Sequence, residues 1–331
     1  MVVHRQDSCG KSRFFYEVSR MLKRIFISSV LFIAILSFVM SLLGGKNNDD
    51  AVVQMGSRVA VIRIEGPIMA GEATDSLFGE NVASTGTIMA ELRAAAKDKS
   101  VKAVLLRINS PGGSVTAAEE IGREIKRLKA ETGKPVITSM GDTAASAGYW
   151  LAACSDKIYA NSSTLTGSIG VYIPYMNTED LYKKIGISGT KIKSGEYKDI
   201  LSNERPMTTA ERELLQNMVN EMYEQFVGVV SEGRKMPVDK VKSLADGRVY
   251  TGKQAKELGL VDEIGNYYDA LDATGALIGS EGTPEVKDFR KQKPWQNIWG
   301  AKISEFIFGR ITENLTNQSR TFEMQTPHAE G

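Results

Sequence analysis

The chain has 331 residues, with 41 Lys and Arg against 40 Asp and Glu, so its formal net charge is +1. A nucleic-acid-binding protein usually carries a basic excess or a basic stripe, and this balance gives no reason to expect one. Hydrophobic residues make up 42% and charged residues 24% of the sequence, which is ordinary globular usage and excludes disorder over the whole chain.

Cysteine and histidine are scarce in this sequence. The two cysteines are Cys9 and Cys154, and the two histidines are His4 and His328. A structural zinc site needs about four such ligands, normally closely spaced, so we expect no metal and no other cofactor. Both histidines lie near a chain end, where order is usually poor, so a Ser-His-Asp triad is not expected either.

The N-terminal part has the pattern of a membrane anchor. Residues 25–43 carry no charged side chain, and at about 1.5 Å per residue they span roughly 29 Å, close to the hydrocarbon thickness of a bilayer. Several basic residues precede this run and few follow it, which places the N-terminus in the cytoplasm. We therefore expect a cytoplasmic segment at 1–24, a single transmembrane helix at 25–43 in the cytoplasmic membrane, a tether at 44–56 and an extracytoplasmic remainder.

The next part of the chain alternates between strand and helix patterns. Strands are expected at 59–64, 101–108 and 135–140, with short candidates at 158–160 and 169–173. Helices are expected after a cap at Ser84 or Thr85, at 117–130 and at 144–154. This rhythm of buried strand, turn and helix predicts an α/β domain with parallel strands.

The second half is more helical. Helical spacing of apolar residues predicts helices at 208–233, 238–244, 253–258 and 267–277. We place the end of the domain, which begins at 57, at residue 280. Residues 281–331 are predicted to form an amphipathic helix and a polar tail. The helix would pack on the body, on a sister chain or on the membrane surface, and we favour packing.

Three loops carry candidate chemistry. Residues 109–113 (NSPGG) follow a strand and precede a helix, and their glycines allow backbone N–H groups to approach a developing negative charge, as in an oxyanion hole; the alternative is a plain turn. Residues 141–148 surround Ser146 with small side chains, which leaves room for a peptide carbonyl to reach a nucleophile; the alternative is tight helix packing. Residues 166–170 form a turn with two hydroxyl groups.

A nucleophilic serine without histidine needs another base. A lysine can serve when desolvation lowers its pKa, and Ser-Lys variants of the triad exist. A shift of about three pKa units costs roughly 4 kcal/mol, so only a mostly buried lysine qualifies. Composition and spacing alone do not select which lysine of this chain is the base.

Six motifs in order resemble one known family. They are NSPGG at 109–113, AASAGY around Ser146, LTGSIG at 165–170, KSGEYKD at 193–199, GRVYTG at 247–252 and the AKxLGLVD run at 255–262. Together they resemble bacterial signal peptide peptidase of the A type, a membrane-anchored serine protease, over roughly residues 57–275. The resemblance is to the short, single-copy form of that family.

The resemblance implies a fold and a set of site residues. The fold would be the Clp-protease or crotonase type, a superhelix of ββα units. Ser146 would be the nucleophile, Lys198 the general base and Ser168 the group that orients the lysine, while the N–H groups of Gly113 and Ala147 would form the oxyanion hole. Ala147 departs from the glycine of the family, but its N–H is retained.

The resemblance also implies partners. It predicts a ring-shaped homo-oligomer in which neighbouring protomers complete each Ser/Lys dyad, signal peptides and other apolar peptides as substrates, contact with membrane lipid and no nucleic acid. Two alternatives stay open beside the serine endopeptidase. One is an acyl-CoA enzyme of the crotonase fold, because an N–H pair also suits a thioester enolate, and the other is a membrane scaffold in which Ser146 and Lys198 merely pack.

Overall fold

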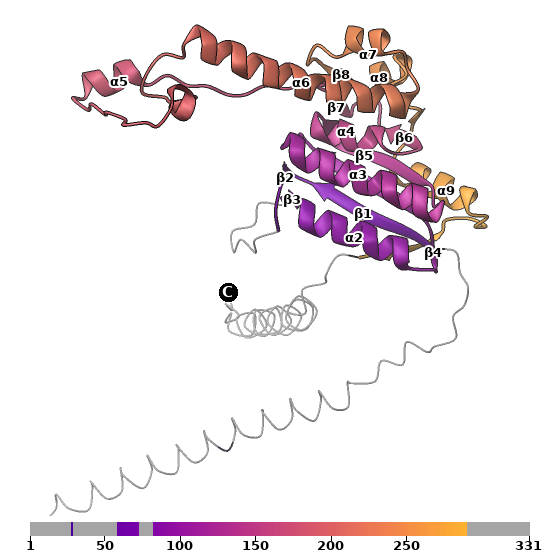
Figure 1. The fold of residues 1–331 in the computed structure, drawn as a ribbon. Coiled ribbons are helices and arrows are strands. Elements are labelled where there is room, and N and C mark those ends of the chain that lie inside the picture. Colours follow the sequence, from indigo (N-terminus) through magenta and orange to yellow (C-terminus); the bar gives the residue numbers. More distant parts are fainter. Residues whose placement is uncertain (1–27, 29–57, 73–81, 290–331) are drawn as a thin grey trace, which may run out of the picture. The chain divides into compact units, whose positions relative to one another are not determined.

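The computed structural model describes residue 28, residues 58–72 and residues 82–289 (Figure 1). The chain divides into two units, Met1–Met55 and Gly56–Gly331, and the domain described below belongs to the second. Several predicted segments lie outside the described residues: the cytoplasmic segment at 1–24, the anchor at 25–43 apart from Ser28, the tether at 44–56, and residues 290–331 of the C-terminal segment predicted at 281–331. Within the described ranges, no helix combines the length and the apolar character needed to cross a membrane.

Strands and helices alternate along the first half of the domain, and helices dominate the second half (Figure 1). The strands are β1 (Arg58–Glu65), β2 (Ile68–Met69), β3 (Ala83–Ser84), β4 (Val101–Ser110), β5 (Val136–Ala145), β6 (Lys157–Ala160), β7 (Leu165–Gly167), β8 (Val249–Thr251), β9 (Glu263–Ile264) and β10 (Glu285–Asp288). The helices are α2 (Thr85–Lys97), α3 (Val115–Thr132), α4 (Ala147–Ala153), α5 (Glu179–Lys184), the 3₁₀ turn η1 (Glu196–Asp199), α6 (Thr209–Arg234), α7 (Val238–Leu244), α8 (Gly252–Glu257) and α9 (Tyr267–Leu277).

The main sheet has the order β10-β1-β4-β5-β6-β9 and is parallel throughout this path. β7 pairs in parallel with the end of β5, where Ala145 lies opposite Gly167, and β8 pairs antiparallel with β7. The predicted parallel α/β layer is therefore confirmed. Because all main strands run the same way, their carboxyl ends and the loops that follow them lie at one edge of the sheet.

Successive residues of the central strands bury on opposite faces of the sheet. In β1, Ile62 and Ile64 enter the large core that also contains α2, α3 and α4, whereas Val59 and Val61 enter a smaller core under α9. Burial on both faces explains why the central strands read as nearly continuous apolar runs. The sheet is thus a rigid layer that holds the loops at its carboxyl edge.

Local capping signals set the helix boundaries. The Ser84 side chain accepts a hydrogen bond from the Thr87 N–H at the start of α2, and Ser114 does the same for Ala117 at the start of α3. α3 ends at Gly133, which adopts the left-handed conformation with φ of 67°. The expected helices at these positions, and those at 208–233, 238–244, 253–258 and 267–277, are confirmed within a few residues.

Three expectations differ from the structure. β5 continues through Ala145, because β7 pairs with residues 143–145, so the expected helix at 144–154 begins only at Ala147. No strand forms at 169–173, because Gly167 and Ser168 both have positive φ and turn the chain away from the sheet. The sheet also extends past residue 280, where we expected the domain to end, since β10 pairs in parallel with β1.

Residues 171–215, which we call the arm, comprise α5, η1 and the first turns of α6. α5 and η1 contain no buried residue, and α6 buries only Glu211 before its contact with the body at Phe226. The predicted apolar stripe of α6 is therefore buried only in its C-terminal half. Large apolar side chains of the arm are exposed to solvent: Tyr172, Met176, Leu181, Ile185, Ile187, Ile192, Tyr197 and Leu201.

Candidate active site

Ser146 occupies the turn between β5 and α4. Its backbone has φ of 53° and ψ of −122°, a conformation that non-glycine residues rarely adopt and that costs of order 1–3 kcal/mol. Two hydrogen bonds hold this conformation: the Ser146 N–H donates to the Gly167 carbonyl at 2.9 Å, and the Ser146 carbonyl accepts from the Trp150 N–H at 2.9 Å. The side chain is half-buried, so its hydroxyl is presented at the carboxyl edge of the sheet.

The loop after β4 packs directly against Ser146. A Cβ atom added to Gly112, which has φ of 109°, would lie 2.7 Å from the Ser146 Cβ and 2.9 Å from the Ala145 carbonyl oxygen. Only glycine therefore fits at this position. The sequence analysis assigned a role to Gly113 but not to Gly112. The two consecutive glycines of the loop were the signal that could have indicated the close contact of Gly112 with the serine.

Gly113 is held by a bridge to β2. The Ile68 N–H donates to the Gly112 carbonyl, and the Ser114 N–H donates to the Ile68 carbonyl, both at 2.9 Å. In such a parallel bridge the N–H of the central residue, here Gly113, points away from the partner strand. A Cβ on Gly113 would approach the Ile68 carbonyl oxygen to 2.0 Å, so this close approach also requires glycine.

Ala147 begins α4 beside the same loop. Its nitrogen lies 3.0 Å from the position of a Cβ on Gly112, so the start of α4 and the glycine loop are neighbours. The first N–H groups of a helix have no partner within that helix. The structure thus places Gly112, which precedes Gly113, against both Ser146 and the Ala147 nitrogen. Backbone N–H groups next to a serine hydroxyl can stabilise the oxyanion of an acyl-transfer reaction.

Ser168 lies on the neighbouring strand connection. Ser146 follows Ala145 of β5 and Ser168 follows Gly167 of β7, and these two preceding residues are register partners. Ser168 also has a positive φ, of 51°, and its N–H donates to the Arg248 carbonyl at 2.8 Å. Ser168 and Ser146 therefore follow neighbouring strands at the same edge of the sheet.

Lys198 is not brought to Ser146 within the chain. It is exposed on η1, and the adjacent Asp199 is tied through Arg205 to Glu211 in the first turn of α6. α6 packs on the body through its C-terminal half, where the ring of Phe226 lies 5.0 Å from that of Trp150 on α4. The 15 residues between Glu211 and Phe226 correspond to about 22 Å of helix, so the lysine turn stands well away from α4 (Figure 1).

Cys154 offers no alternative nucleophile. The thiol is buried at the end of α4, and burial raises its pKa to about 11, which keeps it protonated near neutral pH. Cys9, His4 and His328 lie outside the described residues. Among the residues that the structure describes, no group of three or more metal-ligating side chains occurs.

An open cavity of about 450 Å³ adjoins the glycine loop on the side of Pro111. Two carboxylates, Glu65 and Asp142, face this cavity, and the Thr143 N–H is fixed by the Asn109 side chain at 3.1 Å. The cavity supplies space for a ligand beside Ser110 and Pro111, the residues that lead into Gly112 and Gly113. It is lined by Glu65, Gly66, Asn109, Ser110, Pro111, Asp142 and Thr143.

Comparison with known proteins gives consistent matches over this domain. The model of Clp protease matches residues 76–166 and that of peptidase family S49 matches residues 128–279. A candidate protease of Synechocystis sp. is 44% identical over 198 residues, which are 59% of this chain and 71% of that protein. A candidate signal peptide peptidase SppA of Enterococcus faecium is 41% identical over 206 residues, or 62% of this chain and 60% of that protein.

A third relative is longer. Protease 4 of Haemophilus influenzae is 40% identical over 258 residues, which are 74% of this chain but 41% of that protein. The chain thus spans less than two thirds of the length of this relative and of the one from Enterococcus faecium.

Taken with the geometry around Ser146, these matches define the class of protein by its mixed α/β domain of the Clp protease type and by its similarity to serine proteases. More narrowly, the chain belongs to peptidase family S49, and it is similar to a candidate signal peptide peptidase of that kind.

Proposed function

We propose that this protein is a membrane-anchored serine endopeptidase that uses a Ser/Lys dyad to degrade remnant signal peptides and other apolar peptides at the outer face of the cytoplasmic membrane. The observation that carries this proposal is the strained backbone of Ser146, held at a strand–helix turn against the Gly112–Gly113 loop. The proposal includes the fold, which would be the crotonase-type superhelix of ββα units.

The proposed reaction is acyl transfer to serine. The unprotonated amine of Lys198 accepts the Ser146 proton while the serine oxygen attacks the peptide carbonyl. The carbonyl oxygen becomes an oxyanion, and the N–H groups of Gly113 and Ala147 stabilise it. The tetrahedral intermediate then collapses: Lys198 gives its proton to the leaving amine, which departs, and an acyl-serine remains. In the second step Lys198 accepts a proton from a water molecule, which attacks the ester and releases the acid product. Ser168, next to Ser146 at the sheet edge, orients the lysine.

The proposed dyad is shared between copies of the chain. Lys198 is exposed and lies far along the arm from its own Ser146, so a neighbouring copy has to supply the dry surroundings that a lysine base requires. The exposed apolar side chains of the arm support a ring-shaped homo-oligomer, because a monomer gains nothing from displaying them to water. Each arm would then carry its lysine to the serine of the next protomer.

The proposed location follows from the segment at 25–43 and the basic residues before it. An anchor in the bilayer raises the local concentration of the protease near apolar peptides left in the membrane, and membrane lipid is then a partner of the chain. No metal or other cofactor takes part in the proposed reaction.

The proposal is tested by replacing each member of the dyad. Ser146→Ala and Lys198→Ala are each expected to lower turnover of an unfolded peptide substrate by at least about 10³-fold, because neither group acts without the other. The matched control is Lys184→Ala, which removes an exposed lysine from α5 of the same arm. Turnover by Lys198→Ala at the level of the control would contradict the dyad, and no peptide cleavage by the unaltered protein would favour the acyl-CoA or scaffold alternative.

A further inference from the structure

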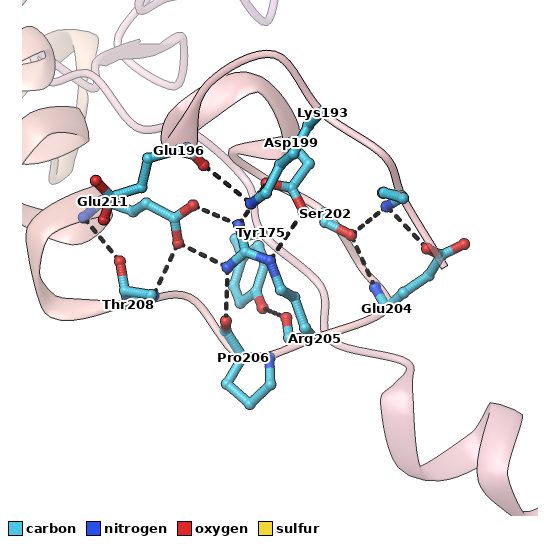
Figure 2. Close-up of polar contacts among 11 residues, drawn as sticks. Tyr175, Lys193, Glu196, Asp199, Ser202, Glu204, Arg205, Pro206, Thr208 and Glu211 are labelled. Atoms are coloured by element: carbon cyan, nitrogen blue, oxygen red, sulfur yellow. Dashed lines mark hydrogen bonds and ion pairs between the residues drawn. The ribbon is translucent and has the colours of Figure 1, made fainter. Parts of the chain in front are cut away.

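A polar cluster takes the place of an apolar core in the arm. α5 and η1 bury no residue, so burial of apolar surface does not fix the conformation of the turn that carries Lys198. Instead, the side chains of Lys193, Asp199, Arg205, Thr208 and Glu211 interlock around this turn, and we call them the arm cluster. Figure 2 shows these side chains converging from the residues just before η1, from η1 itself, from the loop that follows it and from the start of α6.

Arg205 is the centre of the arm cluster. Its guanidinium donates to both Asp199 carboxylate oxygens, from Nε at 3.0 Å and from Nη2 at 2.9 Å. The same group donates from Nη1 to Glu211 at 2.8 Å and from Nη2 to the second Glu211 oxygen. One planar fork thus bridges two carboxylates, a geometry that lysine does not reproduce.

The other contacts of the cluster fix both ends of this bridge. Lys193 donates to Asp199 at 2.6 Å and to the Glu196 carbonyl at 3.0 Å, so one side chain contacts both the first and the last residue of η1. Glu211 accepts from the Thr208 N–H at 2.9 Å and so caps α6. The bridge therefore connects the lysine turn to the 26-residue helix that reaches the body.

Charge and burial agree with a rigid bridge. The side chain of Glu211 is 3% exposed and that of Asp199 is 12% exposed, whereas Lys198 is exposed to solvent. Hydrogen bonds from Arg205 and then Lys193 hold the pKa of Asp199 well below its ordinary range, so this carboxylate is charged at any physiological pH.

We propose that Arg205 is a positioning residue of the peptidase: by bridging Asp199 and Glu211 it fixes the turn that presents Lys198 to the serine of the neighbouring copy. This inference rests on the proposed function, in which Lys198 is the base. Arg205 touches neither substrate nor Ser146, and it acts through the backbone of Asp199, the residue next to the base. Displacement of a catalytic group by about 1 Å lowers a rate by about 10²-fold, which sets the size of the effect.

The test compares Arg205→Gln with Arg212→Gln in the full chain. Arg212 is an exposed arginine one turn into α6, so the control removes the same charge from the same arm. Arg205→Gln is expected to lower kcat on a peptide substrate about 100-fold, with KM changed by less than about twofold and with the oligomer and the helical signal retained. The rate of Ser146 labelling by a fluorophosphonate should fall in parallel, because that reaction also needs the base.

Each outcome decides the matter. Turnover of Arg205→Gln within about twofold of the control would overturn the inference, and so would loss of kcat that tracks loss of assembly. If Arg205→Gln loses the fold of the arm, Asp199→Asn replaces it: a kcat loss above about tenfold in the assembled protein supports the inference, and a smaller loss overturns it. An active Lys198→Ala variant would instead refute the dyad itself, which separates the two failures.

Discussion

At the scale of single residues, the candidate site depends on backbone conformations that few side chains permit. Ser146 and Ser168 both have positive φ, and Gly112 lies so close to Ser146 that any side chain would displace the serine. Such strain persists only where the surrounding structure over-determines it, and here the hydrogen bonds to Gly167 and Trp150 do so. The candidate nucleophile is thus positioned by backbone groups of Gly112, Gly167 and Trp150.

Gly112→Ala tests this dependence. The added Cβ would meet the Ser146 Cβ at 2.7 Å, so we expect peptide turnover to fall by at least about 10²-fold. Gly133→Ala is the matched control, since Gly133 also has positive φ but its Cβ would enter open space.

That control should lower the free energy of unfolding by only about 1 kcal/mol and leave turnover unchanged. Steady-state kinetics together with urea denaturation measure both effects. Equal turnover by the two variants would show that the approach of Gly112 to Ser146 does not matter.

At the scale of elements, α6 joins the arm to the body. Its C-terminal half packs on α4 through Phe226, Val227 and Val230, which are all buried, while Met218 is 47% exposed. The apolar pattern of the sequence runs along the whole helix, but the body covers only one end of it. The other end carries Glu211 of the arm cluster and, in the proposed ring, contacts a neighbouring copy.

Phe226→Ala is expected to lower the free energy of unfolding by about 3 kcal/mol, because it removes a buried ring that contacts Trp150 at 5.0 Å between centroids. Met218→Ala, on the exposed part of the same helix, should change it by less than about 0.5 kcal/mol in the dissociated protein. Urea denaturation followed by tryptophan fluorescence measures both. A small effect of Phe226→Ala would mean that α6 is not anchored at this contact.

The arm cluster also makes a prediction about pH. Hydrogen bonds from Arg205 and from the Thr208 N–H lower the pKa of Glu211 from its ordinary 4.5 to about 2. Because the folded pKa is below the unfolded one, the ionised carboxylate stabilises the arm above about pH 4.5, and this contribution is lost as the pH falls toward 2.

Hydrogen exchange at the start of α6, corrected for the intrinsic rate at each pH, measures this loss of protection. Glu211→Gln, which has no charge to titrate, is expected to show weak protection at every pH. Protection of the unaltered protein that stays constant from pH 5 to about pH 2 would contradict the role given to Glu211.

At the scale of the whole molecule, the proposed base and nucleophile belong to different copies. Arrangement in a closed ring makes every protomer both donor and acceptor of a lysine. Ser146→Ala and Lys198→Ala, each inactive alone, should therefore complement each other when co-expressed, because some interfaces then pair an intact serine with an intact lysine.

With random mixing, about a quarter of the sites would be intact, so peptide turnover should recover to about a quarter of that of the unaltered protein. Mixing the two variants after assembly is the control and should restore nothing if subunits do not exchange. Absence of activity in the co-expressed mixture would refute the shared dyad while leaving a dyad within one chain to be considered.

The sequence alone determined much of the local structure. Nearly continuous apolar runs specified β1 and β4, capping residues such as Ser84 and Thr208 specified where helices begin, and the motifs around Ser146 and Gly113 indicated the peptidase family. These features depend on residues within a few positions of each other, where propensity, periodicity and side-chain-to-backbone hydrogen bonds act.

Only the tertiary structure decided which distant segments meet. Gly112 touches Ser146 because β4 and β5 are neighbours, β10 joins the sheet because β1 offers it a free edge, and α4 starts at Ala147 because β7 pairs with the residues before Ser146. The separation of Lys198 from Ser146 likewise depends on where α6 meets the body. Such contacts arise from the packing of elements far apart in the chain, and no local pattern encodes them.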